Sequence, residues 1–176
     1  MKICVTGGAG FIGSNLVKEL IKQNHEVIVI DNLTNGKLEN LKEVKNKIEF
    51  IKGDIRDLEL LKKVFNGVDA VSHQAALISI LDSIKQPELY EDVNVNGTKN
   101  VLEAARLCNV KKVVFASSCA VYGDNKNLPL KESYLTKPLS PYASNKVKSE
   151  FLCHEYFDKY GMETICLRYF NIFGPG

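Results

Sequence analysis

The feature that most constrains this chain is a glycine-rich turn near its start. A short apolar run, residues 3–6, leads directly into Gly7, Gly10 and Gly13, and a helical pattern follows. The first glycine permits a tight turn off a strand, the second lets backbone approach phosphate oxygens, and the third lets the helix pack closely on a sheet. A helix N-terminus adds free N–H groups and partial positive charge. The pattern predicts a pyrophosphate-binding turn, with a tight turn that binds nothing as the alternative.

A second apolar run favours the ligand-binding interpretation. Residues 27–30 end in Asp31. This acid follows the glycines by about 20 residues, the position at which a dinucleotide-binding unit carries the acceptor for a ribose 2′-hydroxyl. A carboxylate there would repel a phosphorylated ribose. The predicted cofactor is therefore NAD and not NADP.

Strand and helix patterns alternate along the chain. Runs rich in Val, Ile and Phe predict six strands, over residues 3–6, 27–30, 48–52, 70–73, 112–117 and 164–168. Apolar residues at three and four spacing predict helices over 12–23, 58–65, 91–108 and 142–160. Mostly apolar strands alternating with helices indicate an α/β fold of the Rossmann type, a doubly wound parallel sheet with helices on both faces. The expected strand order is 3-2-1-4-5-6, in one domain over residues 1–176.

Composition excludes several classes of partner. The 23 basic and 21 acidic residues are interspersed and give a net charge of +2, so neither a nucleic-acid nor a membrane surface is expected. The sequence shows no signal peptide and no apolar run long enough to span a bilayer, which predicts a cytoplasmic protein. The five cysteines are widely spaced without a C-x-x-C pair, so they are interpreted as reduced thiols, and no metal site is predicted.

A tyrosine and a lysine four residues apart predict proton chemistry. Tyr142 and Lys146 follow Ser140-Pro141 and share one face of a predicted helix. A nearby ammonium and an oxidised nicotinamide favour the phenolate, which can take a proton from a substrate hydroxyl. Alone, such a pair is most simply a packed tyrosine beside a surface lysine. Ser118 ends the fifth predicted strand and adds a hydroxyl across the cleft, so three groups are expected to converge.

Together these residues resemble the extended short-chain dehydrogenase/reductase superfamily, in its NAD-dependent epimerase/dehydratase branch. The resemblance covers essentially the whole chain. Its motifs occur in order as Thr6-Gly-Gly-Ala-Gly-Phe-Ile-Gly13, Asp54-Ile55, His73-Gln-Ala-Ala76, Asn94-Val-Asn-Gly-Thr98, Ser117-Ser-Cys-Ala-Val-Tyr-Gly123, Tyr142-Ala-Ser-Asn-Lys146 and Leu167-Arg-Tyr-Phe-Asn171.

The resemblance implies a role for each matching position. Beyond the glycines, the expected cofactor residues are Phe11 and Ile12 over the pyrophosphate; Asp31, Asn32, Asn35 and Gly36 at the adenosine ribose; Asp54 and Ile55 at adenine; and Gln74, Ala75, Ala76, Asn94 and Phe170 at the nicotinamide half. Ser118, Tyr142 and Lys146 would be the catalytic residues, the last two also touching cofactor. Ser79 and Asn171, with Ser118 and Tyr142, would reach a sugar nucleotide. His73 is interpreted as a packing residue.

Within the family, the sequence is most similar to UDP-hexose 4-epimerases, which oxidise carbon 4 to a ketone and re-reduce it from the other face. Dehydratases and decarboxylases place extra acids just after the catalytic hydroxyl, where this chain has Cys119 and Ala120. The alternatives are a catalytically silent NAD-binding module or an NAD-dependent sugar-nucleotide dehydratase or dehydrogenase.

Family members continue past this length into a substrate domain. The expectation is therefore that a chain of residues 1–176 turns over UDP-sugars weakly or not at all. A homodimer through helices 91–108 and 142–160 is also expected.

Overall fold

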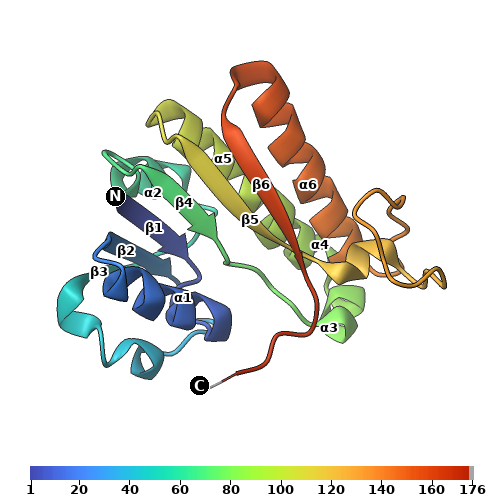
Figure 1. The fold of residues 1–176 in the computed structure, drawn as a ribbon, viewed down its shortest axis with the longest axis horizontal. Coiled ribbons are helices and arrows are strands. Elements are labelled where there is room, and N and C mark those ends of the chain that lie inside the picture. The colour runs from blue at the N-terminus through green and yellow to red at the C-terminus, as the bar shows by residue number, and fades with distance from the viewer. Residues whose placement is uncertain (175–176) are drawn as a thin grey trace.

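All six predicted strands form, and they pair in parallel in the order β3-β2-β1-β4-β5-β6 (Figure 1). This computed structural model describes residues 1–174. The strands are β1 Lys2–Thr6, β2 Glu26–Asp31, β3 Ile48–Lys52, β4 Ala70–His73, β5 Lys112–Ser118 and β6 Glu163–Tyr169. The predicted fold class and strand order are confirmed.

The helices lie in the connections between the strands. They are α1 Phe11–Lys22, α2 Leu58–Val64, α3 Ile80–Lys85, α4 Pro87–Glu91, α5 Gly97–Leu107 and α6 Pro141–Tyr160, with short 3₁₀ turns at Leu38–Leu41, Lys45–Lys47 and Cys119–Tyr122. Local sequence sets the ends of α6. The Ser140 hydroxyl accepts a hydrogen bond from the Ala143 N–H at 3.1 Å, Pro141 occupies the first turn, and Gly161 ends the helix at φ 66°.

The prediction of one regular helix over residues 91–108 was wrong in its start and in its regularity. The helix begins earlier, as α4, and a π-helical segment, Asp92–Asn96, joins α4 to α5. The carbonyl of Asn94 in this segment accepts hydrogen bonds from the hydroxyls of Thr98 and Ser149. Side chains thus satisfy backbone that a regular helix would have paired internally. The short α3 was not predicted at all.

Two apolar layers sandwich the β3-β2-β1 half of the sheet. On one face, Ile3, Val5 and Val29 pack against α1 in a cluster that also includes Leu41 and Val44. On the other face, the second cluster runs beneath α2, α5 and α6 and extends across the whole sheet to Val113, Phe115 and Cys153. Successive strand residues alternate between the two faces because of the pleat.

In the other half of the sheet, β5 and β6 are less covered on the α1 face than on the opposite face. Register places Val5, Ser72, Val114 and Ile165 in one row across the sheet, on the α1 face. Ile165 and Leu167 on that face are 42% and 37% exposed. Figure 1 shows α5 and α6 behind β5 and β6, and within residues 1–174 no helix lies in front of these two strands. The helices on both faces therefore flank the sheet unevenly.

Candidate functional site

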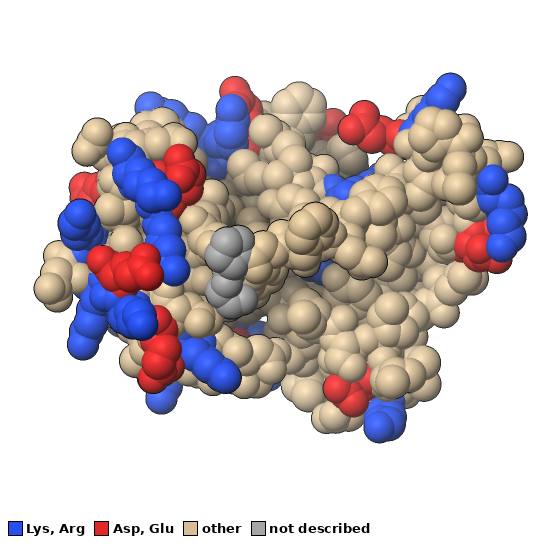
Figure 2. Space-filling model, turned by 60° about the horizontal axis from the view of Figure 1, so that its bottom comes forward, with Lys and Arg blue, Asp and Glu red and all other residues tan. Residues whose placement is uncertain are grey.

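A cavity of about 880 Å³ follows the carboxyl ends of the strands. This volume lies within the range typical of cofactor sites, and the carboxyl ends of an open parallel sheet are where such ligands bind. Figure 2 shows the hollow on this face, bordered mostly by uncharged atoms, with charged side chains toward the edges. The predicted residues that line it are Gly7, Gly10, Phe11, Ile12, Gly13, Asp31, Asn32, Asn35, Gly36, Asp54, Ile55, Gln74, Ala75, Ala76, Ser118, Tyr142, Lys146, Phe170 and Asn171.

The glycine turn has the geometry that its spacing predicts. Gly7 has φ +68°, a left-handed conformation, and a Cβ there would lie 2.7 Å from the Ala75 backbone. A Cβ on Gly13 would lie 2.3 Å from the Gly7 carbonyl oxygen. The glycine turn therefore packs closely against the first turn of α1, and neither Gly7 nor Gly13 can be replaced by a residue with a side chain without a steric clash.

The N-terminus of α1 faces the cavity without a cap of its own. Its N-cap is Gly10, which makes no side-chain capping bond, and the first turn holds no acidic residue. The Ser14 N–H bonds the Gly10 carbonyl, so the helical ladder begins only there. The preceding N–H groups of Phe11, Ile12 and Gly13 line an anion-binding position.

Asp31 ends β2 in a fixed orientation. Its carboxylate accepts hydrogen bonds from the Ala9 N–H at 3.0 Å and from the Leu33 N–H at 2.8 Å. The side chain is nearly buried yet lines the cavity. A carboxylate offers about four lone-pair sites, so two acceptor positions remain for a ligand hydroxyl.

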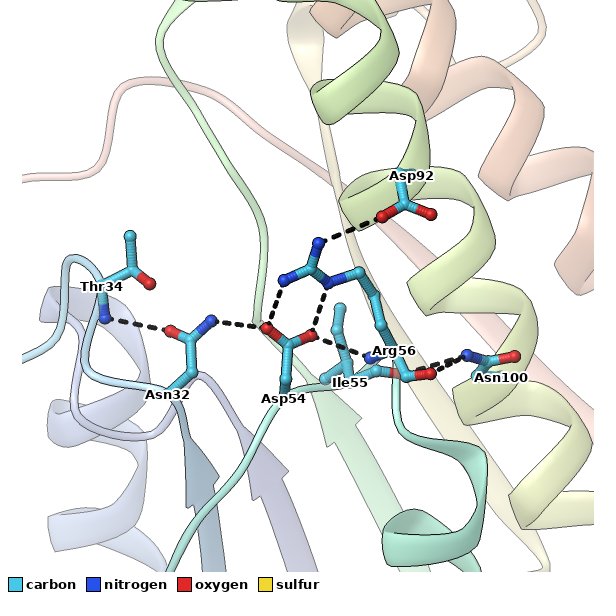
Figure 3. Close-up of polar contacts among 7 residues, drawn as sticks. All are labelled: Asn32, Thr34, Asp54, Ile55, Arg56, Asp92 and Asn100. Atoms are coloured by element: carbon cyan, nitrogen blue, oxygen red, sulfur yellow. Dashed lines mark hydrogen bonds and ion pairs between the residues drawn. The ribbon is translucent and has the colours of Figure 1, made fainter.

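Asp54, by contrast, has its acceptor positions filled (Figure 3). One oxygen accepts from the backbone N–H and Nε of Arg56, and the other from Nη2 of Arg56 and Nδ2 of Asn32, all at 2.9–3.0 Å. Arg56 also donates to Asp92 at 3.1 Å. The Arg56 hydrogen bonds hold the pKa of Asp54 well below its usual range. Asp54 therefore lines the cavity, but its carboxylate is occupied in holding the Arg56 side chain in place.

Three chemistry-bearing side chains meet at the other end of the cavity. Tyr142 and Lys146 project from the first turns of α6, and Ser118 is the last residue of β5. The buried Lys146 ammonium donates to the Ala116 carbonyl at 2.7 Å, lies 4.8 Å from the centroid of the Phe115 ring and lies 5.8 Å from that of Tyr142. All three residues line the same cavity, and their catalytic role stays a prediction.

Burial dominates the ionisation of this group. It lowers the pKa of Lys146 to about 8, against smaller raising effects of Cys153 and Glu150. Burial also raises the pKa of Tyr142, and hydrogen bonding to Ser118 acts in the opposite direction. The Lys146 ammonium donates to the Ala116 carbonyl, and its effect on Tyr142 together with an oxidised nicotinamide stays a prediction.

Two predicted ligand residues do not line the cavity. The Asn94 amide is buried and bonds both the N–H and the carbonyl of Leu77 at 2.9 Å. It holds the segment after β4 in place. The Ser79 hydroxyl accepts from the Asp82 N–H as the N-cap of α3. Neither residue is among those lining the cavity.

The cavity also contains residues that the motifs did not single out. Arg56 is one, and its signal was available, because it stands two residues after Asp54 in the sequence. Apolar side chains from the segments after β4 and β6 are the others that matter, among them Leu77, Ile78 and Ile172. Nothing in their spacing marks them as ligand contacts.

His73 is a packing residue, as interpreted from the sequence. Its Nδ1 lies 2.7 Å from the Thr6 hydroxyl and its Nε2 lies 3.0 Å from that of Thr98. Complete burial, with the nearby Lys146 charge, lowers its pKa to about 3. The imidazole is therefore neutral at physiological pH and ties β1, β4 and α5 together.

Neither a metal-binding cluster nor a membrane-spanning helix occurs in the described part of the chain. Residues 1–174 contain no group of three or more His, Cys, Asp or Glu side chains able to hold a metal ion. No helix in that range combines the length and apolar character needed to cross a bilayer.

Proteins of similar sequence and similar fold are known. A UDP-glucose 4-epimerase of Halalkalibacterium halodurans is 43% identical over 176 residues, which are 99% of this chain and 52% of that protein. The structure of a UDP-N-acetylglucosamine 4-epimerase from Methanobrevibacter ruminantium superposes with a TM-score of 0.94 at 43% identity, over 99% of this chain and 56% of that one. The chain thus spans about half the length of the relatives it matches.

A related dehydratase is nearly as similar. The structure of a dTDP-glucose 4,6-dehydratase from Streptomyces venezuelae, with NAD bound, superposes with a TM-score of 0.92 at 38% identity, over 96% of this chain and 55% of that one. The family model described as NAD dependent epimerase/dehydratase matches residues 3–176. With its glycine turn, its acid at the end of β2 and its Ser118, Tyr142 and Lys146, the chain belongs to the NAD-dependent epimerase/dehydratase family.

Proposed function

We propose that this chain is the NAD-binding and proton-transferring part of a UDP-hexose 4-epimerase. The observation that carries the proposal is one continuous cavity that starts at the glycine turn and ends at Ser118, Tyr142 and Lys146. A dinucleotide spans such a cavity end to end, with its pyrophosphate at the N-terminus of α1 and its nicotinamide beside α6.

Features of the cavity fit NAD. The uncapped N-terminus of α1 suits the pyrophosphate, and Asp31 retains acceptor positions for the adenosine ribose. Gln74, which lines the cavity beside the glycine turn, has a buried Oε1 atom without a hydrogen-bond partner. A buried polar atom in a cavity wall without a partner is the kind of group that a bound ligand satisfies. Lys146 and Tyr142 would hold the nicotinamide half.

When bound, NAD supplies the hydride acceptor and donor of the reaction. The protein's part is to move one proton and to orient the sugar. Tyr142, as phenolate, takes the proton of the hydroxyl on carbon 4 and later returns it. Ser118 orients that hydroxyl. Lys146, charged below its pKa of about 8, would help hold the nicotinamide half, and its positive charge would favour the phenolate of Tyr142.

An epimerase is favoured over the related dehydratases by the residues after Ser118. An elimination needs an additional acid and base beside the sugar, whereas Cys119 and Ala120 occupy the positions where dehydratases carry them. Cys119 does not line the cavity, and alanine cannot transfer a proton. Oxidation followed by re-reduction needs only the three groups already present.

The proposal is tested by mixing the NAD-loaded chain with UDP-galactose and following absorbance of reduced nicotinamide in a single turnover. We expect NAD binding, slow reduction and loss of reduction in Tyr142→Phe with NAD binding retained. We expect weak or no steady turnover, because poorly held reactants forfeit about 7–11 kcal/mol of catalytic advantage. A chain that fails to bind NAD, or that reduces it equally well in Tyr142→Phe, contradicts the proposal.

We also propose that two copies pair through α5 and α6. These helices pack on each other, with the Tyr156 hydroxyl donating to Glu103 at 2.9 Å. Large apolar side chains remain exposed on them at Leu107, Phe151, Phe157 and Tyr160. Covering such side chains favours a two-fold contact between like helices. Sedimentation at micromolar concentration should give a dimer, and a monomer throughout would count against it.

A further inference from the structure

We propose that the ion pair between the buried Glu150 and the partly buried Arg168, together with Ser117, is a positioning unit for Ser118, Tyr142 and Lys146. The inference rests on the proposed function, because it assigns these three residues as the reacting group. It adds residues that do not themselves touch the sugar but fix the place and charge of those that do.

The geometry of the pair is specific. Arg168 donates from Nε and Nη2 to the two carboxylate oxygens of Glu150, at 3.0 and 2.8 Å. The Ser117 hydroxyl donates to the same carboxylate at 2.5 Å. The Arg168 guanidinium also stacks 4.8 Å from the centroid of the Tyr122 ring and donates to the Glu132 carbonyl at 3.1 Å. Glu150 and Ser117 are 5% and 3% exposed.

Ser117 and Glu150 each lie close in sequence to a residue of the reacting group, and Arg168 joins them. Ser117 directly precedes Ser118 in β5, and Arg168 is its register partner in β6. Glu150 lies one helical turn beyond Lys146 on α6. Arg168 also precedes the cavity-lining Tyr169 and Phe170. One buried carboxylate therefore joins β5 and α6, which carry the reacting residues, to β6, which leads into the cavity-lining Tyr169 and Phe170.

The pair is better explained by positioning than by stability. Desolvating two charges costs about as much as their attraction returns, so apolar residues of similar volume would hold the elements together as well. A bidentate arginine–carboxylate pair instead fixes a relative orientation, because both partners are planar and both hydrogen bonds must align.

The unit also sets the charge environment of Lys146. The groups facing this ammonium are Tyr142, Glu150 and Cys153 from α6, His73 from β4, and the Phe115 ring and Ala116 carbonyl from β5. His73 is neutral. Glu150 is therefore the anionic group among them, and Arg168 partly neutralises it.

The two single substitutions, one at each member of the ion pair, should shift the pKa of Lys146 in opposite directions. In Glu150→Gln an uncompensated Arg168 remains, so the pKa of Lys146 should fall below its value of about 8. In Arg168→Gln an uncompensated Glu150 remains, so that pKa should rise. The double variant Glu150→Gln/Arg168→Gln should lie between the two. If the substitutions only loosened the structure, they would shift the pKa of Lys146 in the same direction in both single variants.

The measurement is the Cε chemical shift of Lys146 against pH in protein labelled with ¹³C-lysine, assigned with Lys146→Met. The matched control is Glu163→Gln, which removes the Lys112–Glu163 pair that joins β5 and β6 far from the cavity, at 2.9 Å. It should leave the titration unchanged. Because the double variant leaves no unpaired buried charge, it keeps the test usable if a single variant fails to fold.

Ligand binding provides the second readout. AMP should bind the wild type and Glu150→Gln equally, whereas NAD should bind Glu150→Gln roughly tenfold more weakly at pH 8, about the loss of one charge-assisted hydrogen bond. Equal titration midpoints in all folded variants, or shifts of the same sign in both single variants, would overturn the proposal. A wild type that fails to bind NAD would contradict the proposed function instead, since the titration needs no cofactor.

Discussion

The two halves of this sheet are built differently. In the β3-β2-β1 half, β1 and β2 are buried on both faces, with Val5 and Val29 fully covered, while the edge strand β3 is partly exposed; this half carries the glycine turn and Asp31. In the β4-β5-β6 half, β4 is buried, but β5 and β6 are less covered on the α1 face, where Ile165 and Leu167 are exposed; this half carries Ser118, Tyr142 and Lys146.

The comparison shows two ways of holding a site. In the first half, apolar packing and backbone hydrogen bonds fix the site, as in the contact of Gly13 with Gly7 and the bonds of Asp31 to backbone N–H groups. In the second half, β5 and β6 are less covered on the α1 face, and buried polar side chains supply the rest through the Glu150–Arg168 pair and the Lys146–Ala116 bond. Stability should therefore depend mainly on the first half and ionisation on the second.

The largest expected effect is on the free energy of unfolding, when the same substitution is made in each half of the sheet. Ile3 and Ile165 lie on the same face of the sheet, the first 9% and the second 42% exposed. Ile3→Ala should lower the free energy of unfolding by about 2–5 kcal/mol, because it leaves a cavity beneath α1. Ile165→Ala should cost under about 1 kcal/mol, because water already reaches the side chain. Urea denaturation measures both, and equal losses would remove the distinction between the halves.

The next effect concerns cofactor selection in the first half. We predict that NAD binds better than NADP, because Asp31 accepts from the ribose 2′-hydroxyl and repels a 2′-phosphate. Replacing Asp31 by Ala should narrow that preference by about 1.5–3 kcal/mol, the contribution of one charged hydrogen bond. Calorimetry with both nucleotides is the measurement. Equal binding of NAD and NADP by the wild type would contradict the assignment of Asp31.

A smaller effect should appear at alkaline pH and come from the second half. Burial lowers the pKa of Lys146 from 10.5 to about 8, so between these values the unfolded chain binds more protons than the folded one. The contribution of Lys146 to the free energy of unfolding should therefore rise as the pH increases from 8 to 10.5. Measuring the free energy of unfolding of the wild type and of Lys146→Met across this pH range isolates the contribution of Lys146. The wild type should gain stability relative to the variant, and a relative loss would refute the assignment.

The smallest effect belongs to the first half at acid pH. Hydrogen bonds from Arg56 depress the pKa of Asp54, so its stabilising contribution is complete above the unfolded value near 3.8 and is lost as the pH falls below it. Wild type should lose stability more steeply than Asp54→Asn below about pH 4. If the free energies of unfolding of the two proteins fell in parallel with pH, the network in Figure 3 would not stabilise the fold.

Much of the fold and one end of the site could be predicted from the sequence. Strand runs and the glycine turn are local patterns, so the six strands, Gly7, Gly13 and the acid ending β2 are confirmed where they were expected. The helix predicted over residues 91–108 forms, but its earlier start and its π-helical segment were not predicted, because the contacts made there come from elsewhere in the chain. Ser149 bonds the Asn94 carbonyl from α6, and the Asn94 side chain bonds Leu77.

The sequence by itself determined the order of the strands, the position of the glycine turn and the meeting of Ser118 with Tyr142 and Lys146, because residue spacing and the parallel sheet bring those groups to one edge. Only the tertiary structure decided which polar groups remain free for a ligand. Asp31 and Asp54 are both acids at strand ends, yet one keeps open acceptor positions and the other is filled by Arg56 and Asn32. Such occupancy depends on neighbours brought together by folding, which spacing along the chain does not encode.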